Sequence, residues 1–153
     1  MKNVYPIFFC FIFLLISCSD SPYYIKSHQF KNNNWTLKDK PSFTVDIKDT
    51  CKLYDFIFSI RTTTDYKYNN IWVYLYSKPP KGKRSKEAFE IKITNPDGSW
   101  KGKKSGSIVE NIFKFSKRKL PQIGKYNFQL ELATQEGDLK EVLDATLKIP
   151  NQK

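Results

Sequence analysis

Apolar residues alternate with polar residues along much of this chain, and this period of two constrains the fold more than any other feature of the sequence. Successive side chains of a β-strand point to opposite faces of a sheet, so such alternation predicts strands with one buried face. It recurs, with turn signals between the segments, in residues 43–47, 53–61, 89–93, 126–132 and 143–149. Asn95-Pro96-Asp97-Gly98 predicts a tight hairpin turn between two strands.

Seven or eight short strands without a convincing long helix predict an all-β fold. We expect a single antiparallel β-sandwich of the immunoglobulin-like or jelly-roll-like type. Residues 107–115 fit either a helical face or a short strand, and both alternatives stay open.

Residues 71–76 are apolar on both faces, which predicts a central strand whose residues Trp72, Tyr74 and Tyr76 lie in the core. The alternative is that these three rings form an exposed platform that stacks on sugar rings.

The N-terminus has the parts of a bacterial lipoprotein signal peptide. Lys2 precedes thirteen mostly apolar residues, Val4 to Ile16, a run shorter than the roughly 20 residues that span a bilayer. Leu15-Ile16-Ser17-Cys18 then matches a lipobox, whose cysteine takes a diacylglycerol on its thiol. We predict cleavage before Cys18, lipid on Cys18 and anchorage by two or three acyl chains. The alternative is an ordinary signal peptide with a chance cysteine.

These features divide the chain into three segments. Residues 1–17 are the predicted cleaved signal peptide, residues 18–30 the tether and a first extended segment, and residues 31–150 the sandwich. Cleavage leaves Cys51 as the remaining unlipidated cysteine, so no intramolecular disulfide can form, and we expect Cys51 at a strand edge. Ser19 follows Cys18 where the enteric inner-membrane retention signal has aspartate, which favours the outer membrane.

Residue types that carry catalysis or bind metals are scarce. His28 is the one histidine, and the chain has no C-x-x-C pair, H-E-x-x-H motif, G-x-S-x-G elbow or glycine-rich phosphate loop. The turn at residues 95–98 lacks the alternating acids of a calcium loop. We therefore expect no enzymatic activity, no metal and no cofactor besides the lipid on Cys18.

Basic residues are in excess, with a formal net charge of +11 that becomes +10 when Lys2 leaves with the signal peptide. They gather in three clusters, which are Lys78, Lys81, Lys83, Arg84 and Lys86, then Lys101, Lys103 and Lys104, then Lys117, Arg118 and Lys119. In an exported chain such clusters favour lipid head groups, lipopolysaccharide, acidic glycans or acidic proteins over nucleic acid. The alternative is a hydrated surface without a ligand.

Several stretches in their order resemble the gliding-motility lipoprotein family GldH of Bacteroidetes. They are Asn34-Trp35 with Lys38-Asp39, Asp49-Thr50, Tyr54 through Arg61, Asp65-Tyr66-Lys67-Tyr68-x-Asn70, Gly98-x-Trp100-x-Gly102-Lys103, and Pro121-x-x-Gly124-x-Tyr126-x-Phe128. The chain departs from the family pattern in two places. Residues 130–134 lack a histidine and an arginine, so a partner contact made by that arginine would be missing, and Ala145 rather than glycine follows Asp144.

The resemblance implies a non-enzymatic envelope lipoprotein, an accessory or structural component of the gliding-motility and type IX secretion machinery that contacts its other envelope proteins. The alternative is a carbohydrate- or polyanion-binding sandwich lipoprotein. We predict a partner surface at Asp65, Tyr66, Tyr68 and Asn70, in a connection between strands where the core does not require them. In the competing interpretation the two tyrosines cap the sandwich, and Asp65 and Asn70 complete a turn.

Overall fold

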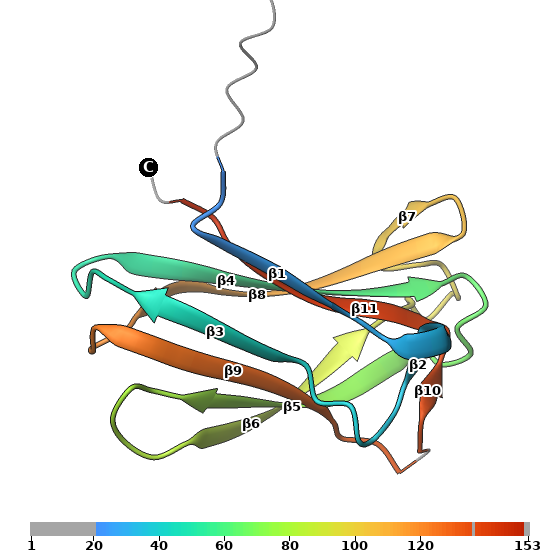
Figure 1. The fold of residues 1–153 in the computed structure, drawn as a ribbon. Coiled ribbons are helices and arrows are strands. Elements are labelled where there is room, and N and C mark those ends of the chain that lie inside the picture. Colours follow the sequence, from blue (N-terminus) through green and yellow to red (C-terminus); the bar gives the residue numbers. More distant parts are fainter. Residues whose placement is uncertain (1–20, 136, 152–153) are drawn as a thin grey trace, which may run out of the picture.

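The computed structural model of the chain describes residues 21–135 and 137–151 (Figure 1). The predicted fold class is confirmed, because these residues form antiparallel sheets that pack together as a β-sandwich. In the same two ranges, no helix is long and apolar enough to cross a membrane. The predicted signal peptide and Cys18 lie outside the described residues.

Two sheets form the sandwich. The first, which we call the β4 sheet, has the spatial order β1 (Tyr24–Gln29), β11 (Val142–Ile149), β4 (Leu53–Thr63), β8 (Ile108–Lys119) and β7 (Lys103–Ser105). The second, the β5 sheet, has the order β3 (Ser42–Ile47), β9 (Gly124–Leu132), β5 (Asn70–Lys78) and β6 (Ser85–Lys92). A short pair, β2 (Asn34–Trp35) with β10 (Leu139–Lys140), follows the 3-10 turn η2 (Lys31–Asn33).

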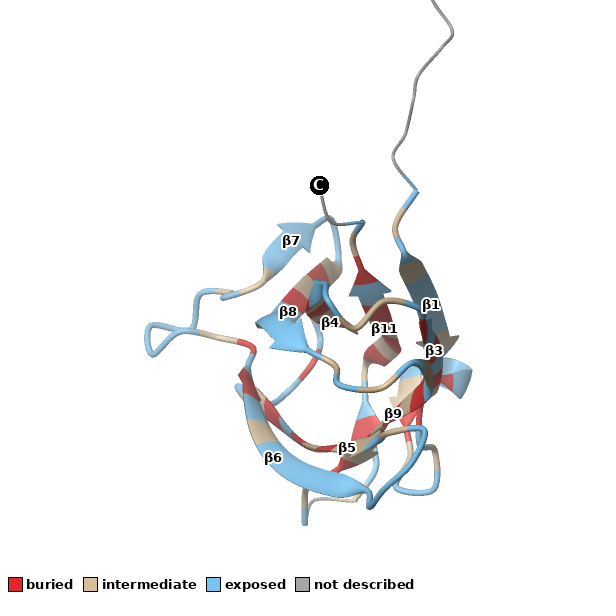
Figure 2. Cartoon of the chain, turned by 90° about the vertical axis from the view of Figure 1, so that its left-hand side faces the viewer, coloured by how far each residue is buried: buried red, intermediate tan, exposed pale blue. Residues whose placement is uncertain are grey.

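The alternating residues form these strands because their apolar side chains all reach the space between the two sheets. In β3, Phe43, Val45 and Ile47 are buried while the residues between them are exposed or half-buried. The same alternation runs along β9, and the ring of Phe43 packs edge-on against that of Phe58 with centroids 6.3 Å apart. Figure 2 shows that buried positions line β4, β8, β11, β5 and β9, whereas β7 and most of β6 are exposed.

The expectation that Trp72, Tyr74 and Tyr76 lie in the core is wrong. Trp72 is 44% exposed and both tyrosines are half-buried, because only the opposite face of β5 points at the β4 sheet. No other element of the described chain covers the outer face of the β5 sheet (Figure 1). The alternative of an exposed aromatic face is therefore the one that the structure supports.

Of residues 107–115, which fitted either a helix or a strand, residues 108–115 belong to strand β8 and Ser107 lies in the turn before it. Its residues pair antiparallel with β4 from Thr63↔Ile108 to Leu53↔Lys119. Pairing along a neighbouring strand of matching length overrides a weak helical pattern.

The first extended segment is a strand of the sandwich. β1 pairs with β11 from Tyr24↔Ile149 to Gln29↔Asp144. This strand, Tyr24–Gln29, lies within residues 18–30 and is an edge strand of the β4 sheet.

The predicted hairpin turn is present at residues 95–98. The backbone N–H of Asn95 donates to the carbonyl oxygen of Ser99 at 2.8 Å, and that of Gly98 donates to the carbonyl of Asn95 at 3.0 Å. Gly98 adopts φ +82°, which a glycine reaches without steric cost.

The two ends of the sandwich carry different loops. Residues 48–52, 79–84 and 120–123 connect strands at the end where β1 begins and β11 ends, on the left of Figure 1. We call this the tether end. The connection 64–69 and the β2–β10 pair lie at the far end. The 11 residues of β4 place the two ends roughly 36 Å apart, at about 3.3 Å per residue.

Candidate functional site

Two of the three basic clusters meet at the tether end. The side-chain amide of Gln122 accepts the backbone N–H of Lys81 and donates to its carbonyl oxygen, both at 3.0 Å. These two bonds fix the β5–β6 loop against the β8–β9 loop, so that Lys83 and the end of β8 border one opening. The third cluster lies elsewhere, where Lys101 and Lys103 share a surface with Glu90 and Glu110.

A cleft of about 460 Å³ opens into the sandwich between these loops, and we call it the basic cleft. Its floor is mainly aromatic and is formed by the core residues Phe56, Phe58, Leu75, Phe115, Tyr126 and Phe128. Four cationic side chains line it, those of Lys83, Lys117, Arg118 and Lys119. Glu87 is the acidic residue of the lining. The cleft therefore combines an apolar interior with a positively charged rim.

The cleft exists because the inward positions of β5 and β6 become small or polar towards the tether end. Nearer the far end the paired inward residues are apolar, as in Val73↔Phe89. The next inward pairs are Leu75↔Glu87 and Ser77↔Ser85. Serines cannot fill the space opposite the phenylalanines of the β4 sheet, so a hollow remains where a packed core would otherwise continue.

A β-bulge shapes the rim on the other side of the cleft. The β4–β8 register shifts between Tyr54 and Phe56, and Lys117 on the bulged strand has φ +54°. Asp55 holds this irregular backbone by accepting the N–H of Lys117 at 2.8 Å. Hydrogen bonds from Lys114 and from this N–H hold the pKa of Asp55 below its usual value. Bulges re-aim side chains, and this one places a run of three cations at the cleft.

The residues of the predicted partner surface lie at the far end, and the structure divides them by exposure. Tyr66 is only 5% exposed and donates its hydroxyl to the carbonyl of Asn70 at 3.0 Å. Burial raises the pKa of Tyr66. Tyr68 is 40% exposed and packs edge-on against Tyr66, with ring centroids 5.7 Å apart. Tyr66 thus caps the core, while Tyr68 and the exposed Asp65 are accessible.

An open hollow of about 490 Å³ adjoins the accessible residues at the far end. It is lined by side chains of both signs, those of Asp65, Lys67, Tyr68, Asp138, Lys140 and Glu141. Thr63 fixes the start of the connection, because its hydroxyl accepts the N–H of Asp65 at 3.2 Å and donates to Glu141 at 2.7 Å. Asn70 instead donates its side-chain amide to Glu90 at 2.8 Å, at the start of β5.

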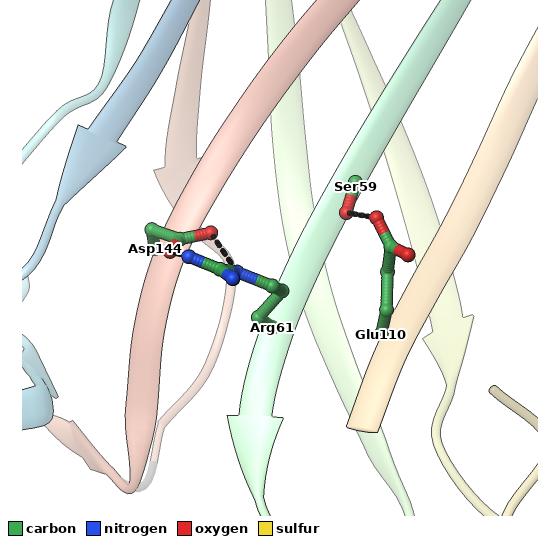
Figure 3. A network of polar contacts seen from close by, with 4 residues as sticks. All are labelled: Ser59, Arg61, Glu110 and Asp144. Carbon is green, nitrogen blue, oxygen red and sulfur yellow. Dashed lines mark hydrogen bonds and ion pairs between the residues drawn. The ribbon is translucent and has the colours of Figure 1, made fainter. Parts of the chain in front are cut away.

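An ion pair with one buried partner, Asp144, lies on the β4 sheet, and sequence reasoning did not predict it (Figure 3). Arg61 on β4 donates from Nε to both oxygens of Asp144 on β11, at 3.0 and 2.9 Å, and from Nη2 as well. Next to it, Ser59 donates to Glu110 at 2.7 Å. The hydrogen bonds with Asp144 raise the pKa of the Arg61 guanidinium. The signal in the sequence was an arginine and an aspartate within two strands rich in apolar residues.

The aromatic face of the β5 sheet is partly covered by cations from β6 and its loop. The guanidinium of Arg84 lies 3.6 Å from the ring centroid of Tyr76, and Nζ of Lys86 lies 3.6 Å from that of Tyr74. Trp72 is the ring of this face that no such cation covers within the described chain.

The few residues with catalytic potential are dispersed. Nε2 of His28 lies 2.9 Å from Oδ1 of Asp39, and the imidazole packs edge-on against Phe30. Cys51 is exposed in the loop before β4 rather than within a strand. In residues 21–135 and 137–151, no three His, Cys, Asp or Glu side chains form a group that could hold a metal ion.

Comparison with known proteins establishes the family. The family model of the GldH lipoprotein matches residues 22–149. The chain belongs to the GldH lipoprotein family. It is 28% identical over 142 residues to the gliding motility lipoprotein GldH homolog of Christiangramia forsetii, covering 91% of this chain and 87% of that protein. It is 24% identical over 123 residues to the gliding motility lipoprotein GldH of Flavobacterium johnsoniae, covering 80% and 76%. No solved structure matches the chain significantly.

Membership confirms the resemblance to GldH that the sequence motifs indicated. It makes the chain a lipoprotein of a gliding-motility family, held at the cell envelope by lipid.

Proposed function

We propose that this GldH-family chain is a non-enzymatic, accessory or structural component of the gliding-motility and type IX secretion machinery. In this proposal Cys18 carries the lipid, the outer membrane is the site of anchorage, and other envelope proteins bind the far end. The names of the two relatives support the link to gliding motility. The observation that carries the partner surface is the exposure of Asp65 and Tyr68 at the end opposite the tether.

The length of the tether supports this orientation. The residues between Cys18 and Tyr23 can span at most about 17 Å when fully extended. The far end lies roughly 36 Å beyond the tether end, as the length of β4 requires. A domain held so closely by its lipid keeps the tether end at the membrane and presents the hollow beside Tyr68 to the envelope space. Exposed aromatic residues of this kind are frequent anchors in protein interfaces.

Site-specific photo-crosslinking in the native envelope tests the partner surface. A photoreactive phenylalanine derivative at position 68 should capture gliding or type IX secretion proteins, which mass spectrometry would identify. The matched control carries the same derivative at position 112, because Ile112 is also exposed, at 57% against 40% for Tyr68, but lies on the β4 sheet away from the far end. Asp65→Lys should weaken the capture at position 68. Equal capture from both positions, or none from position 68, would contradict the assignment.

A carbohydrate-binding role is the second candidate, and the exposure of Trp72 is the observation that favours it. A flat exposed indole on a sheet can stack on a sugar ring. Trp72→Ala should then abolish retention on lipopolysaccharide or glycan resins without unfolding the protein, since this ring is not part of the core. Tyr76→Ala should have a smaller effect, because Arg84 already occupies the face of that ring. Unchanged retention of the Trp72 variant would remove this candidate.

A further inference from the structure

We propose that the basic cleft binds one anionic phospholipid of the membrane to which the chain is tethered, with an acyl chain on the aromatic floor and the phosphate at the cationic rim. Neither family membership nor the proposed function assigns a ligand to this cleft. The proposal is independent of the far end and rests on where the tether leaves the domain, on charge and on the shape of the cleft.

The tether and the cleft share one end of the sandwich. The chain enters β1 beside the β3–β4 loop, where the ring of Tyr23 packs against that of Tyr54 with centroids 5.6 Å apart. Tyr54 pairs with Arg118 of the rim in the β4–β8 ladder. Since the tether spans at most about 17 Å, the lipid on Cys18 holds this end of the sandwich, which carries the rim, close to the membrane surface.

The charge at the tether end is complementary to an anionic membrane surface. Its loops and strand ends carry Lys48, Lys52, Lys81, Lys83, Arg84, Lys117, Arg118, Lys119 and Lys125. The acids of this end are fewer, namely Asp46, Asp49, Asp55 and Glu87, and Asp55 pairs with Lys114 at 2.8 Å. The rim cations Lys83, Arg118 and Lys119 form no ion pair with any described carboxylate. The far end, in contrast, has side chains of both signs around its hollow.

Apolar side chains at the same end provide a second contact with a bilayer. Ile123 is 66% exposed at the tip of the β8–β9 loop, and Leu53 is exposed at the start of β4. Exposed aliphatic residues flanked by lysines and arginines are typical of surfaces that lie in the membrane interface. These two residues therefore place the opening of the cleft at the depth where acyl chains begin.

The cleft itself is suited to an acyl chain rather than to a head group alone. Its volume lies in the range of small-molecule sites, which are lined by apolar side chains with a few polar groups that fix orientation. The deepest lining residues, Phe56, Phe58 and Phe128, belong to the buried core. Glu87 lines the β6 side of the cleft, where it pairs with Leu75, further from the tether end than the Ser77↔Ser85 pair. Its carboxylate repels an anion, so the phosphate binds on the opposite, β8 side, at Arg118 and Lys119.

Native mass spectrometry of the full lipidated protein, released from lipid nanodiscs, tests this inference. The nanodiscs contain phosphatidylcholine either alone or mixed with phosphatidylglycerol. We expect the protein to retain one phosphatidylglycerol molecule and to prefer it over phosphatidylcholine. Retention of both lipids in proportion to their abundance, or of neither, would overturn the proposal.

Two variants and one control separate the rim from the cleft. Arg118→Glu with Lys119→Glu reverses the rim charge and should lower retention of phosphatidylglycerol by about tenfold or more. Ser77→Leu fills the hollow with an apolar side chain, which should preserve folding yet lower retention to a similar extent. Lys103→Glu with Lys104→Glu makes the same charge change in the third basic cluster and should leave retention unchanged. Full retention by the Ser77 variant, or an equal loss in the control, would refute a lipid in the cleft.

Cys51 offers an independent reporter, because it is exposed in the β3–β4 loop of the tether end. A nitroxide attached to Cys51 should become less mobile in nanodiscs when phosphatidylglycerol is present, and Arg118→Glu with Lys119→Glu should reverse this. The matched reporter is Asp97→Cys in a Cys51→Ser background, which lies in the exposed hairpin turn at the far end. Equal responses of the two labels would show that the tether end does not face the membrane. Crosslinking at position 68 does not depend on either result.

Discussion

Removing the guanidinium of Arg61 should destabilise the protein far more than removing its partner, because the two sides of this ion pair differ in exposure. The side chain of Asp144 is 2% exposed, whereas that of Arg61 is 44% exposed. Arg61→Met leaves the buried carboxylate of Asp144 without its charge partner. Asp144→Leu leaves a guanidinium that can still be hydrated from outside.

The expected magnitudes follow from that difference. Breaking a buried ion pair by removing one partner costs about 3–5 kcal/mol. The partial exposure of Arg61 screens its charge, so we expect the lower value, about 3 kcal/mol, for Arg61→Met. For Asp144→Leu we expect about 1 kcal/mol. The double variant should lie within about 1 kcal/mol of the wild type, because apolar replacement of both partners leaves no unpaired charge.

Urea unfolding of the four proteins at neutral pH would measure these free energies as a double-mutant cycle. The thermal midpoint of Arg61→Met should fall by roughly 10 °C. Lys114→Met is the control, since Lys114 is 46% exposed and its partner Asp55 is 26% exposed, so that this pair is nearer to solvent and should contribute at most about 1 kcal/mol. Equal costs for the two single variants, or a double variant as unstable as Arg61→Met, would refute the argument that the carboxylate is desolvated.

Three further predictions concern packing, pH and lipidation. Gly102→Ala should lower the unfolding free energy by about 2 kcal/mol or more, because a Cβ at this position would lie 2.3 Å from the carbonyl oxygen of Glu110. The control Gly98→Ala, which has open space around its Cβ, should lower it by only about 1 kcal/mol. Since burial raises the pKa of Tyr66, the contribution of Tyr66 to stability should be constant below pH 10.0, the value for a free tyrosine, and should fall above it. Tyr66→Phe should reduce that fall in urea titrations from neutral to strongly alkaline pH. Cys18→Ala should abolish palmitate labelling and leave uncleaved precursor, and persistent labelling would contradict the lipobox.

The strands could be predicted from the sequence because burial of one strand face is a local property. Phe43, Val45 and Ile47 alternate with polar residues, and no other part of the chain is needed to interpret that pattern. The face of Trp72 could not be assigned in this way. Whether an apolar outer face is covered depends on distant elements, and in this chain nothing described lies over the β5 sheet.

The basic cleft could not be predicted for a related reason. Ser77 and Ser85 are unremarkable in the sequence, and only the β5–β6 register makes them an inward-facing pair opposite the phenylalanines of β4. The rim likewise depends on the bulge at Lys117. The sequence does not indicate this bulge, because lysine rarely adopts the positive φ that Lys117 has here. The basic clusters were visible as charges, but their meeting at one end depends on the two hydrogen bonds between Gln122 and Lys81.

In the proposed function the two ends of the sandwich have separate roles, one at the membrane and one towards other envelope proteins. A flexible lipid anchor alone would leave the domain free to rotate, so a partner at the far end would meet it in many orientations. Contacts between rim cations and lipid phosphates would fix the tether end to the bilayer and thereby direct the hollow beside Tyr68 away from it. Orientation of this kind lowers the entropy lost on binding a partner, although it adds no contact to the interface itself. The proposed lipid cleft and the proposed partner surface would therefore act together although roughly 36 Å of β4 separates them.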